Sequence, residues 1–471
     1  MSNYLTNYSQ SLSRGAFDQT VMNTFAFGSG SRGSSLGVSN SSGGGNITVV
    51  SPLTALYEAI RKTPFHTETN GIFSKRTHHA SPSTEEFILD ISCGESISGF
   101  LTSHNRVFIA GEMDSTTGMY TCVDLSMIKE KEGSCVVRQV AVGSSLFCIV
   151  TENGTVWTSM NRSERLQRLY FEKSQHDRTV DLSVKIKYVS CGLSHIMALS
   201  ENNEVYAAGF TSYGCSGANT GSHGSYSQYR NGVKVDIPLV PGDEVRDVYA
   251  AYYRTLIVSK MGYIYTTGWG VYHQQGLGDD TSNLEKFVLH EPMKKTGEKV
   301  VKVALGALHT IALTESGKVY GFGFNSYGQL FDTNGDEVYP KHLRFAKPIK
   351  DIHCGWHYSI FMTSDNQFYG CGANSSSELA STGMPTHNIT IPTLMTLPTV
   401  PNISANDLSW RIFASSFSSN TFYLGQSTVS KSFQWMQQRL KIAARETNAF
   451  SDIAFVLTNC ENSNTSSILM Q

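Results

Sequence analysis

A unit of about fifty residues repeats along most of this 471-residue chain, and such a repeat restricts the fold to an array or a ring of similar units. Each unit has an apolar residue, Cys or Leu, Gly, two residues and His, then an apolar run, a polar turn and a second apolar run. The clearest copies are VSCGLSHIMALSENNEVYAAGF (189–210), VALGALHTIALTESGKVYGFGF (303–324) and IHCGWHYSIFMTSDNQFYGCGA (352–373). Looser copies begin at Ile91, Val140 and Val248, so six units follow one another.

The pattern inside each unit predicts an antiparallel β-hairpin. The turns carry the Gly or Asn that tight hairpins need for a positive φ, at 152–154, 201–203, 260–262, 315–317 and 364–366. Only 16% of the residues are charged, well below the roughly 25% of an average domain, and 41 glycines supply turns. The chain is therefore predicted to be all-β.

A seventh unit is divided between the two ends of the repeat region. TFAFGSGSRGSSLG (24–37) matches only the second half of the unit, and WRIFASSFSSNTFYL (410–424) matches only the first half. If 410–424 pairs with 24–37, the two halves complete one blade and leave no open sheet edge. The prediction is a closed seven-bladed β-propeller over 24–424, followed by a short α-helix and a tail.

These units resemble the Regulator of Chromosome Condensation 1 (RCC1) repeat, whose pattern joins Gly-x-x-His-Ser to a Val-Tyr-x-Trp-Gly strand and a Gly-Gln-Leu-Gly turn. The match is best over 305–330, whereas Met160 replaces the strand glycine and Ala250-Ala251 the first glycine. We interpret the three repeat histidines as equivalent positions in different blades. The residues to which the resemblance gives a structural role in the repeat are Gly28, Gly94, Gly111, Gly143, Gly192, His195, Gly209, Gly268, Gly306, His309, Gly323, Gly355, His357 and Gly372.

Several segments depart from the repeat. Residues 1–23 are expected to be a flexible N-terminal segment, and 38–86 a flexible insertion holding one short helix. Smaller excursions at 216–232 and 281–299 also leave the pattern. Apolar residues at helical spacing predict a helix over 432–448. The tail, 449–471, contains FSDIAF, which resembles the start of a BTB domain, so we expect the chain to be truncated relative to such proteins.

No catalytic, cofactor-binding or metal-binding set emerges. Residues 28–33 have the spacing of a dinucleotide fingerprint but lack a following helix and an acidic partner, and 332–337 lacks the glycine and glutamate positions of a calcium loop. His195, His309 and His357 are expected to be held apart in separate blades rather than to share a metal. The nine cysteines include no CxxC pair, which favours reduced thiols.

Protein recognition is thus the leading functional class. A net charge of −2 gives no field for nucleic acid, and no apolar run is long enough for a membrane helix, so an intracellular protein, cytoplasmic or nuclear, is expected. The resemblance implies a guanine-nucleotide exchange factor for a small GTPase. It assigns no exchange residues, because the motif fixes blades rather than the exchange surface, and the acidic loop residues considered for that role are Asp181, Asp247 and Asp351. The alternatives are a substrate adaptor of a BTB/cullin ubiquitin ligase and, last, a chromatin-associated scaffold.

Overall fold

The computed structural model describes 24–28 and 47–52, Leu56 and Ala59, then 88–397 with ten short gaps, 408–414 and 421–427. The gaps are 96, 112–120, 145, 161–165, 175–176, 211, 219–227, 332–334, 376–377 and 380–386. Residues 1–398 and 412–423 belong to one compact unit, and the remainder to a second. The predictions for 1–23, 432–448 and 449–471 lie outside the described residues.

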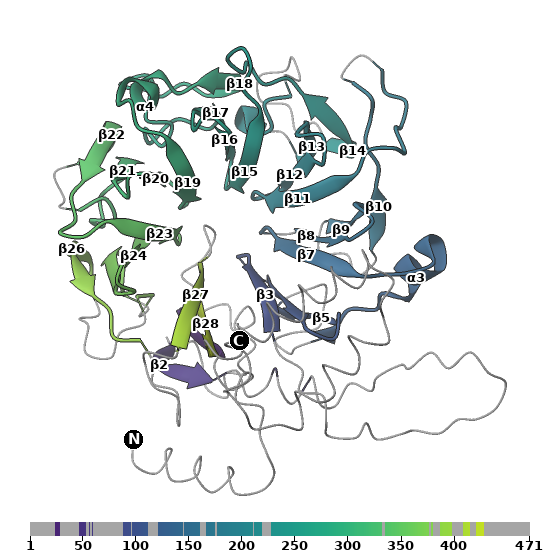
Figure 1. The fold of residues 1–471 in the computed structure, drawn as a ribbon, viewed down its shortest axis with the longest axis horizontal. Helices are drawn as coiled ribbons and strands as arrows, with labels where there is room; N and C mark the ends of the chain where they lie inside the picture. The colour runs from purple at the N-terminus through teal and green to yellow at the C-terminus, as the bar shows by residue number, and fades with distance from the viewer. Residues whose placement is uncertain are drawn as a thin grey trace, which may run out of the picture. The chain divides into compact units, whose positions relative to one another are not determined.

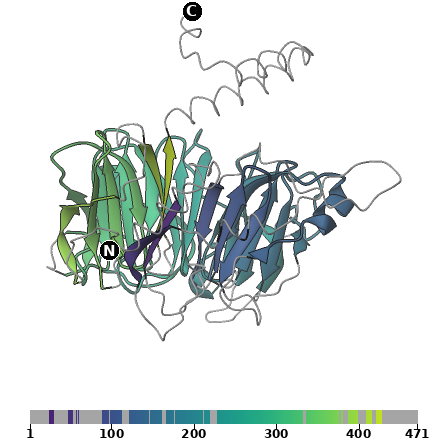
Figure 2. The same cartoon turned by 90° about the horizontal axis from the view of Figure 1, so that it is seen from below.

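Within the described residues the strands form seven four-stranded antiparallel sheets, the blades, arranged around a centre (Figure 1). Seen from the side, the strands run across the ring from one face to the other (Figure 2). The first three blades, each from its inner to its outer strand, are β3 (Ile88–Cys93), β4 (Ile97–Thr102), β5 (Val107–Gly111) and β6 (Thr121–Cys122); β7 (Val137–Val142), β8 (Leu146–Thr151), β9 (Val156–Met160) and β10 (Gln167–Leu169); and β11 (Ile186–Cys191), β12 (His195–Ser200), β13 (Val205–Phe210) and β14 (Gln228–Val235).

The remaining blades follow the same order. They are β15 (Val245–Ala251), β16 (Arg254–Ser259), β17 (Ile264–Gly268) and β18 (Leu284–Leu289); β19 (Val300–Leu305), β20 (His309–Thr314), β21 (Val319–Gly323) and β22 (Glu337–Leu343); β23 (Ile349–Cys354), β24 (Tyr358–Thr363), β25 (Phe368–Gly372) and β26 (Ile389–Leu394); and, in the seventh blade, β27 (Leu408–Ala414), β28 (Thr421–Ser427), β1 (Thr24–Gly28) and β2 (Ile47–Pro52). Short helices α3 (Ser126–Glu132), η3 (Ser212–Gly214) and α4 (Glu291–Lys295) lie in connections.

The second strand of each of the first six blades is buried along its whole length. It lies between two strands of its own sheet and between two neighbouring sheets, which is why the sequence there is a nearly continuous apolar run rather than an alternation. The hairpin that follows turns at a residue of positive φ, Gly in three blades and Asn in three, such as Gly154 and Asn203. The predicted hairpins are therefore present, and each blade is completed by an inner and an outer strand.

The seventh blade contains both ends of the repeat region, because the sheet order is β2-β1-β28-β27. Strand β2 lies inside the stretch 38–86, which the sequence predicted to be a flexible insertion, and it pairs antiparallel with β1. Likewise β18 lies in one of the excursions predicted to leave the blades, and β14 begins in the other. These predictions were wrong in part because these outer strands mix polar residues with apolar ones, so their apolar pattern is weak.

Glycine between the first and second strands makes room for a side chain three residues later. A Cβ on Gly192 would lie 1.9 Å from Cε1 of His195, and one on Gly306 would lie 2.1 Å from Cε1 of His309. In the sixth blade the residue in this place is Tyr358, which a Cβ on Gly355 would meet at 1.9 Å. The third residue after the glycine also pairs across the hairpin with the strand glycine at Gly209, Gly323 or Gly372.

The interpretation of His357 as the equivalent of His195 and His309 was therefore wrong. The sixth unit reads Gly-Trp-His-Tyr, so His357 comes two residues after the glycine and lies in the connection before β24. Its ring stacks between Trp356 and Tyr327, with centroid distances of 5.3 and 4.8 Å. The buried repeat position belongs to Tyr358.

The buried side chain at this position reaches into the next blade. Nε2 of His195 hydrogen-bonds Thr255 Oγ1 at 3.2 Å, and Nε2 of His309 hydrogen-bonds Ser359 Oγ at 3.0 Å. In the fourth blade Arg254 stands in place of the histidine and donates to Gln274 O and Gly306 O, each at 2.9 Å, and to Thr310 Oγ1 and His309 O. This series of side chains links blades three to six.

Candidate functional site

The topology gives the ring two different faces. Consecutive strands are antiparallel, so the connections after first and third strands lie on one face and the hairpin turns after second strands lie on the other. We call them the glycine-loop face and the turn face. Each carries a distinct type of side chain.

The turn face is dominated by ion pairs between a hairpin turn and a neighbouring connection or strand. The pairs that reach the turns are Arg138–Glu201 at 3.8 Å, Lys260–Glu244 at 2.7 Å, Lys299–Glu315 at 3.3 Å and Lys347–Asp365. All of these side chains are about a third exposed or more, so each pair contributes little stability, but it neutralises the charge of the turn residue that it contains.

The glycine-loop face instead carries a continuous series of aromatic rings, which we call the aromatic arc. Ring centroids of successive members are 4.8–6.1 Å apart, mostly edge-to-face, which is a favourable arrangement for aromatic pairs. The arc comes from the third to the sixth blades and comprises Tyr213, Tyr252, Tyr253, Trp269, Tyr272, Phe324, Tyr327, Trp356 and His357.

Several members of the arc are open to solvent. Tyr213 is 45% exposed, Tyr272 37% and Trp356 41%, and Val271 beside them is 48% exposed. Large aromatic side chains that are exposed and contiguous are unusual on a monomer and are enriched at the centres of protein interfaces. The arc is therefore the strongest candidate for a binding surface among the described residues.

The backbone beneath the arc adopts sparsely populated conformations. Tyr213 has φ 59° and Tyr252 has φ 45°, and His273, next to Tyr272, has φ 56°. A bulky residue in the left-handed region costs of order 1–3 kcal/mol, and such residues cluster at functional sites. Here the unusual φ of Tyr213 and Tyr252 accompanies mutual contact with Trp269, at 6.0 and 5.8 Å between ring centroids.

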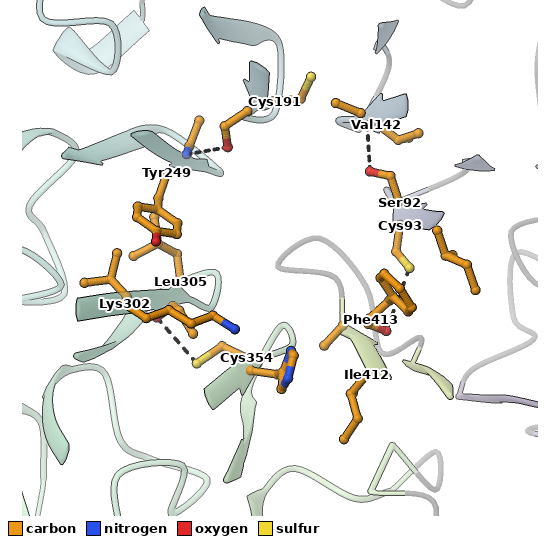
Figure 3. Close-up of a pocket in the computed structure, with 18 of the residues that line it drawn as sticks. Ser92, Cys93, Val142, Cys191, Tyr249, Lys302, Leu305, Cys354, Ile412 and Phe413 are labelled. Atoms are coloured by element: carbon orange, nitrogen blue, oxygen red, sulfur yellow. Dashed lines mark hydrogen bonds between the residues drawn. The ribbon is translucent and has the colours of Figure 1, made fainter. Parts of the chain in front are cut away.

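The second feature is a cavity of about 310 Å³ at the centre of the ring, lined by the inner strands (Figure 3). Its wall is held together by bonds from blade to blade: Ser92 Oγ accepts from Val142 N at 2.9 Å, Ser190 Oγ accepts from Ala250 N at 2.9 Å, and Cys93 Sγ donates to Phe413 O at 3.9 Å. The last of these joins the first blade to the seventh.

A cluster of ionisable groups lies at this wall, where Lys302 and His353 line the cavity and both contact Asp351. Lys302 Nζ is 2.5 Å from Asp351 Oδ1, and His353 Nε2 is 3.2 Å from Asp351 Oδ2. Burial opposes ionisation of Asp351, but the hydrogen bond from His353 and the charge of Lys302 outweigh it and hold the pKa of this carboxyl below its usual range. An acid that stays ionised and paired is suited to stabilising the wall rather than to transferring protons.

The thiols in the wall are equally unsuited to chemistry. Burial raises the pKa of Cys354 to about 12 and that of Cys93 further above its ordinary value, so both are protonated at neutral pH. Among the described residues, no group of three or more His, Cys, Asp or Glu side chains could hold a metal ion. No helix in the described part of the chain is both long and apolar enough to cross a membrane.

The acidic residues considered for nucleotide exchange do not converge. Asp181 caps a turn outside the blades and accepts from Ser183, whereas Asp247 pairs with Arg246 on β15. Asp351 pairs with Lys302 and His353, two residues that line the central cavity. None of the three belongs to the aromatic arc. Most of 28–33, the stretch with dinucleotide spacing, lies outside the described residues.

The sequence reasoning missed the arc. A signal was present, because an aromatic residue followed three positions later by Tyr occurs after the third strand as FTSY (210–213), WGVY (269–272) and FNSY (324–327). The third, fourth and fifth blades each supply one such pair, and the glycine loops supply Tyr252, Tyr253, Trp356 and His357.

Comparison with known proteins shows which family and which relatives the chain resembles. The RCC1-like domain model matches residues 23–420. The ultraviolet-B receptor UVR8 of Arabidopsis thaliana is 27% identical over 249 residues, 52% of this chain and 54% of UVR8. Human HERC4, a probable E3 ubiquitin-protein ligase, is 30% identical over 202 residues, 42% of this chain and 18% of HERC4. The aligned part thus spans about half of the first relative and less than a fifth of the second.

Solved structures agree on the fold. Prp20p of Saccharomyces cerevisiae superposes with a TM-score of 0.64 at 13% identity, covering 91% of this chain and 98% of that one. Human WBSCR16 gives a TM-score of 0.60 at 16% identity, covering 86% and 100%. The repeat, the seven sheets and the extent of the family match together show that this chain belongs to the RCC1-like domain family.

Proposed function

We propose that this chain is a protein-recognition module and that the aromatic arc is its binding surface. The observation that carries the proposal is the contrast between the two faces: four hairpin turns of the turn face hold ion pairs, whereas the glycine-loop face carries contacting aromatic rings from four blades, several of them exposed. Rigid aromatic side chains bury large areas at little entropic cost, which makes them effective anchors for a protein partner.

The more specific form of the proposal is regulation of a small GTPase by nucleotide exchange. Its support is family membership and the fold shared with Prp20p, a protein described with its binding to Gsp1p and histones. Exchange requires only that one surface binds the nucleotide-free GTPase more tightly than the loaded form. It needs no acid, base or metal, which suits a surface made of rings and loops.

The test is the release of a fluorescent GDP analogue from a panel of small GTPases, including a Ran-type one, with and without the purified chain. We expect faster release from at least one GTPase. The double variant Tyr272→Ala/Trp356→Ala should abolish the acceleration, whereas Met261→Ala, at a 45% exposed position on the turn face, should leave it unchanged. Equal loss in both variants, or acceleration that survives in the arc variant, would exclude the arc as the exchange surface.

A second candidate is substrate recognition for a ubiquitin ligase, favoured by the similarity to HERC4. The BTB/cullin version depends on the tail 449–471, which lies outside the described residues. No acceleration with any GTPase would favour this adaptor role. The chromatin-scaffold alternative has as its support the histone binding described for Prp20p.

A further inference from the structure

We propose that a second site, at the rim between the fifth and sixth blades, binds a short acidic peptide through an inserted apolar side chain. The site is a cavity of about 470 Å³, distinct from the central cavity and from the aromatic arc. The fifth blade contributes a residue of the connection between β21 and β22 and the connection after β22, and the sixth contributes β26, one residue of β25 and the end of β24. Its lining includes Phe331, Arg344, Phe345, Lys347, Tyr369 and Ile391.

The wall of this rim cavity is aromatic. Phe345 contacts Phe331 at 5.1 Å between ring centroids, Phe361 at 4.9 Å and Tyr369 at 6.3 Å. Phe361 is fully buried and forms part of the core beneath. The rings are edge-to-face or tilted relative to one another, so they form the sides of a recess rather than a flat platform. Such a recess accepts a leucine or phenylalanine side chain better than it stacks a nucleobase.

The outer edge of the cavity is β26, the outermost strand of its sheet, which exposes large apolar side chains. On β26, Ile391 is 73% exposed and Leu394 50% exposed. Pro392 lies between them and has no backbone N–H to donate, which disfavours addition of a further strand along this edge. We therefore infer that a ligand contacts this strand through side chains rather than by extending the sheet.

The charge around the cavity selects the ligand. Residues 339–350 contain Lys341, Arg344, Lys347 and Lys350 but no acidic residue, in a chain whose net charge is −2. Lys347 pairs with Asp365 and Lys341 with Glu337. Among the described residues no ion pair involves Arg344, which is exposed at the cavity mouth. A carboxylate next to the inserted side chain would complete a charge-assisted pair with this guanidinium.

The experiment measures fluorescence anisotropy of a labelled Glu-Glu-Leu-Phe-Glu-Glu peptide titrated with the full chain. We expect saturable binding that weakens with added salt. The peptides Lys-Lys-Leu-Phe-Lys-Lys and Glu-Glu-Gly-Ser-Glu-Glu should each bind at least about tenfold more weakly, because the first repels Arg344 and the second has nothing to insert.

Variants locate the binding. Arg344→Glu and Ile391→Asp should each weaken binding about tenfold or more, while Lys295→Glu and Leu182→Asp, at exposed positions elsewhere, should leave it unchanged. Tyr272→Ala should also bind the peptide normally, which separates this site from the aromatic arc. Absence of binding, equal binding of the lysine peptide, or tighter binding of a uridine oligonucleotide would overturn the proposal.

Discussion

Arg254 offers the sharpest test of how the blades are held together. Its side chain is 1% exposed, and burial lowers the pKa of the guanidinium to about 9, so it is charged at neutral pH. Its donors meet oxygen atoms of the fourth and fifth blades, and none of these partners is a carboxylate. The hydrogen bonds must therefore offset the cost of burying a cation.

Three substitutions separate hydrogen bonding from packing. Arg254→Ala removes the bonds and leaves a cavity, and we expect a loss of about 4 kcal/mol in the free energy of unfolding. Arg254→Met fills most of the space but leaves the Gly306 carbonyl without its guanidinium donor, for a loss of about 2–3 kcal/mol. Arg254→His restores the residue of the third and fifth blades and can reach the Thr310 hydroxyl, so about 1–2 kcal/mol should be lost.

The measurement is urea unfolding followed by tryptophan fluorescence, with midpoints compared at an unchanged slope. The order of stability expected is wild type, then His, Met and Ala. A Met variant as stable as the wild type would refute the reasoning, because it would show that the buried cation and its bonds contribute no net stability.

Two further predictions concern other buried positions in and beside the blades. Gly355→Ala should lower the free energy of unfolding by about 3 kcal/mol or more in thermal unfolding, because the new Cβ would lie 1.9 Å from the Tyr358 ring. Adding Tyr358→Leu should recover part of this loss, and no recovery would contradict this cause. Burial lowers the pKa of His195 and of His290 to about 4. The unfolded state therefore binds more protons than the folded state between pH 4 and 6.5. The free energy of unfolding should fall as the pH is lowered through that range, by up to about 3 kcal/mol per histidine. His195→Gln should reduce the stability difference between pH 7 and pH 5, and an unchanged difference would exclude this histidine as a source.

Much of the fold could be read from local patterns. Apolar runs bounded by Gly or Asn turns predict hairpins, because a turn of positive φ selects those residues whatever lies around it. The two half-units at 24–37 and 410–424 predict one shared blade, and the structure has β1 and β28 side by side in the seventh sheet. The outer strands β14 and β18 were missed because their sequences mix polar residues with apolar ones and lack a strong apolar pattern.

Register at one position could not be read from the sequence. Gly-Trp-His-Tyr and Gly-x-x-His both place a histidine near the glycine, but a shift of one residue exchanges the buried side with the exposed side. Only the packing against Gly355 shows that Tyr358 is inside, and that His357 lies on the glycine-loop face. Likewise, nothing local distinguishes Arg254 as the residue that replaces the histidine and reaches into the next blade.

The repeated unit by itself determined the architecture of this protein: hairpins, blades and a ring assembled from both ends of the repeat region. The binding surfaces were decided by tertiary structure. Aromatic residues about fifty positions apart come into contact only when neighbouring blades pack side by side, and the rim cavity arises only where the connection after β22 meets β26. Backbone conformation follows short-range sequence, whereas a surface shared by several blades depends on contacts that no single unit contains.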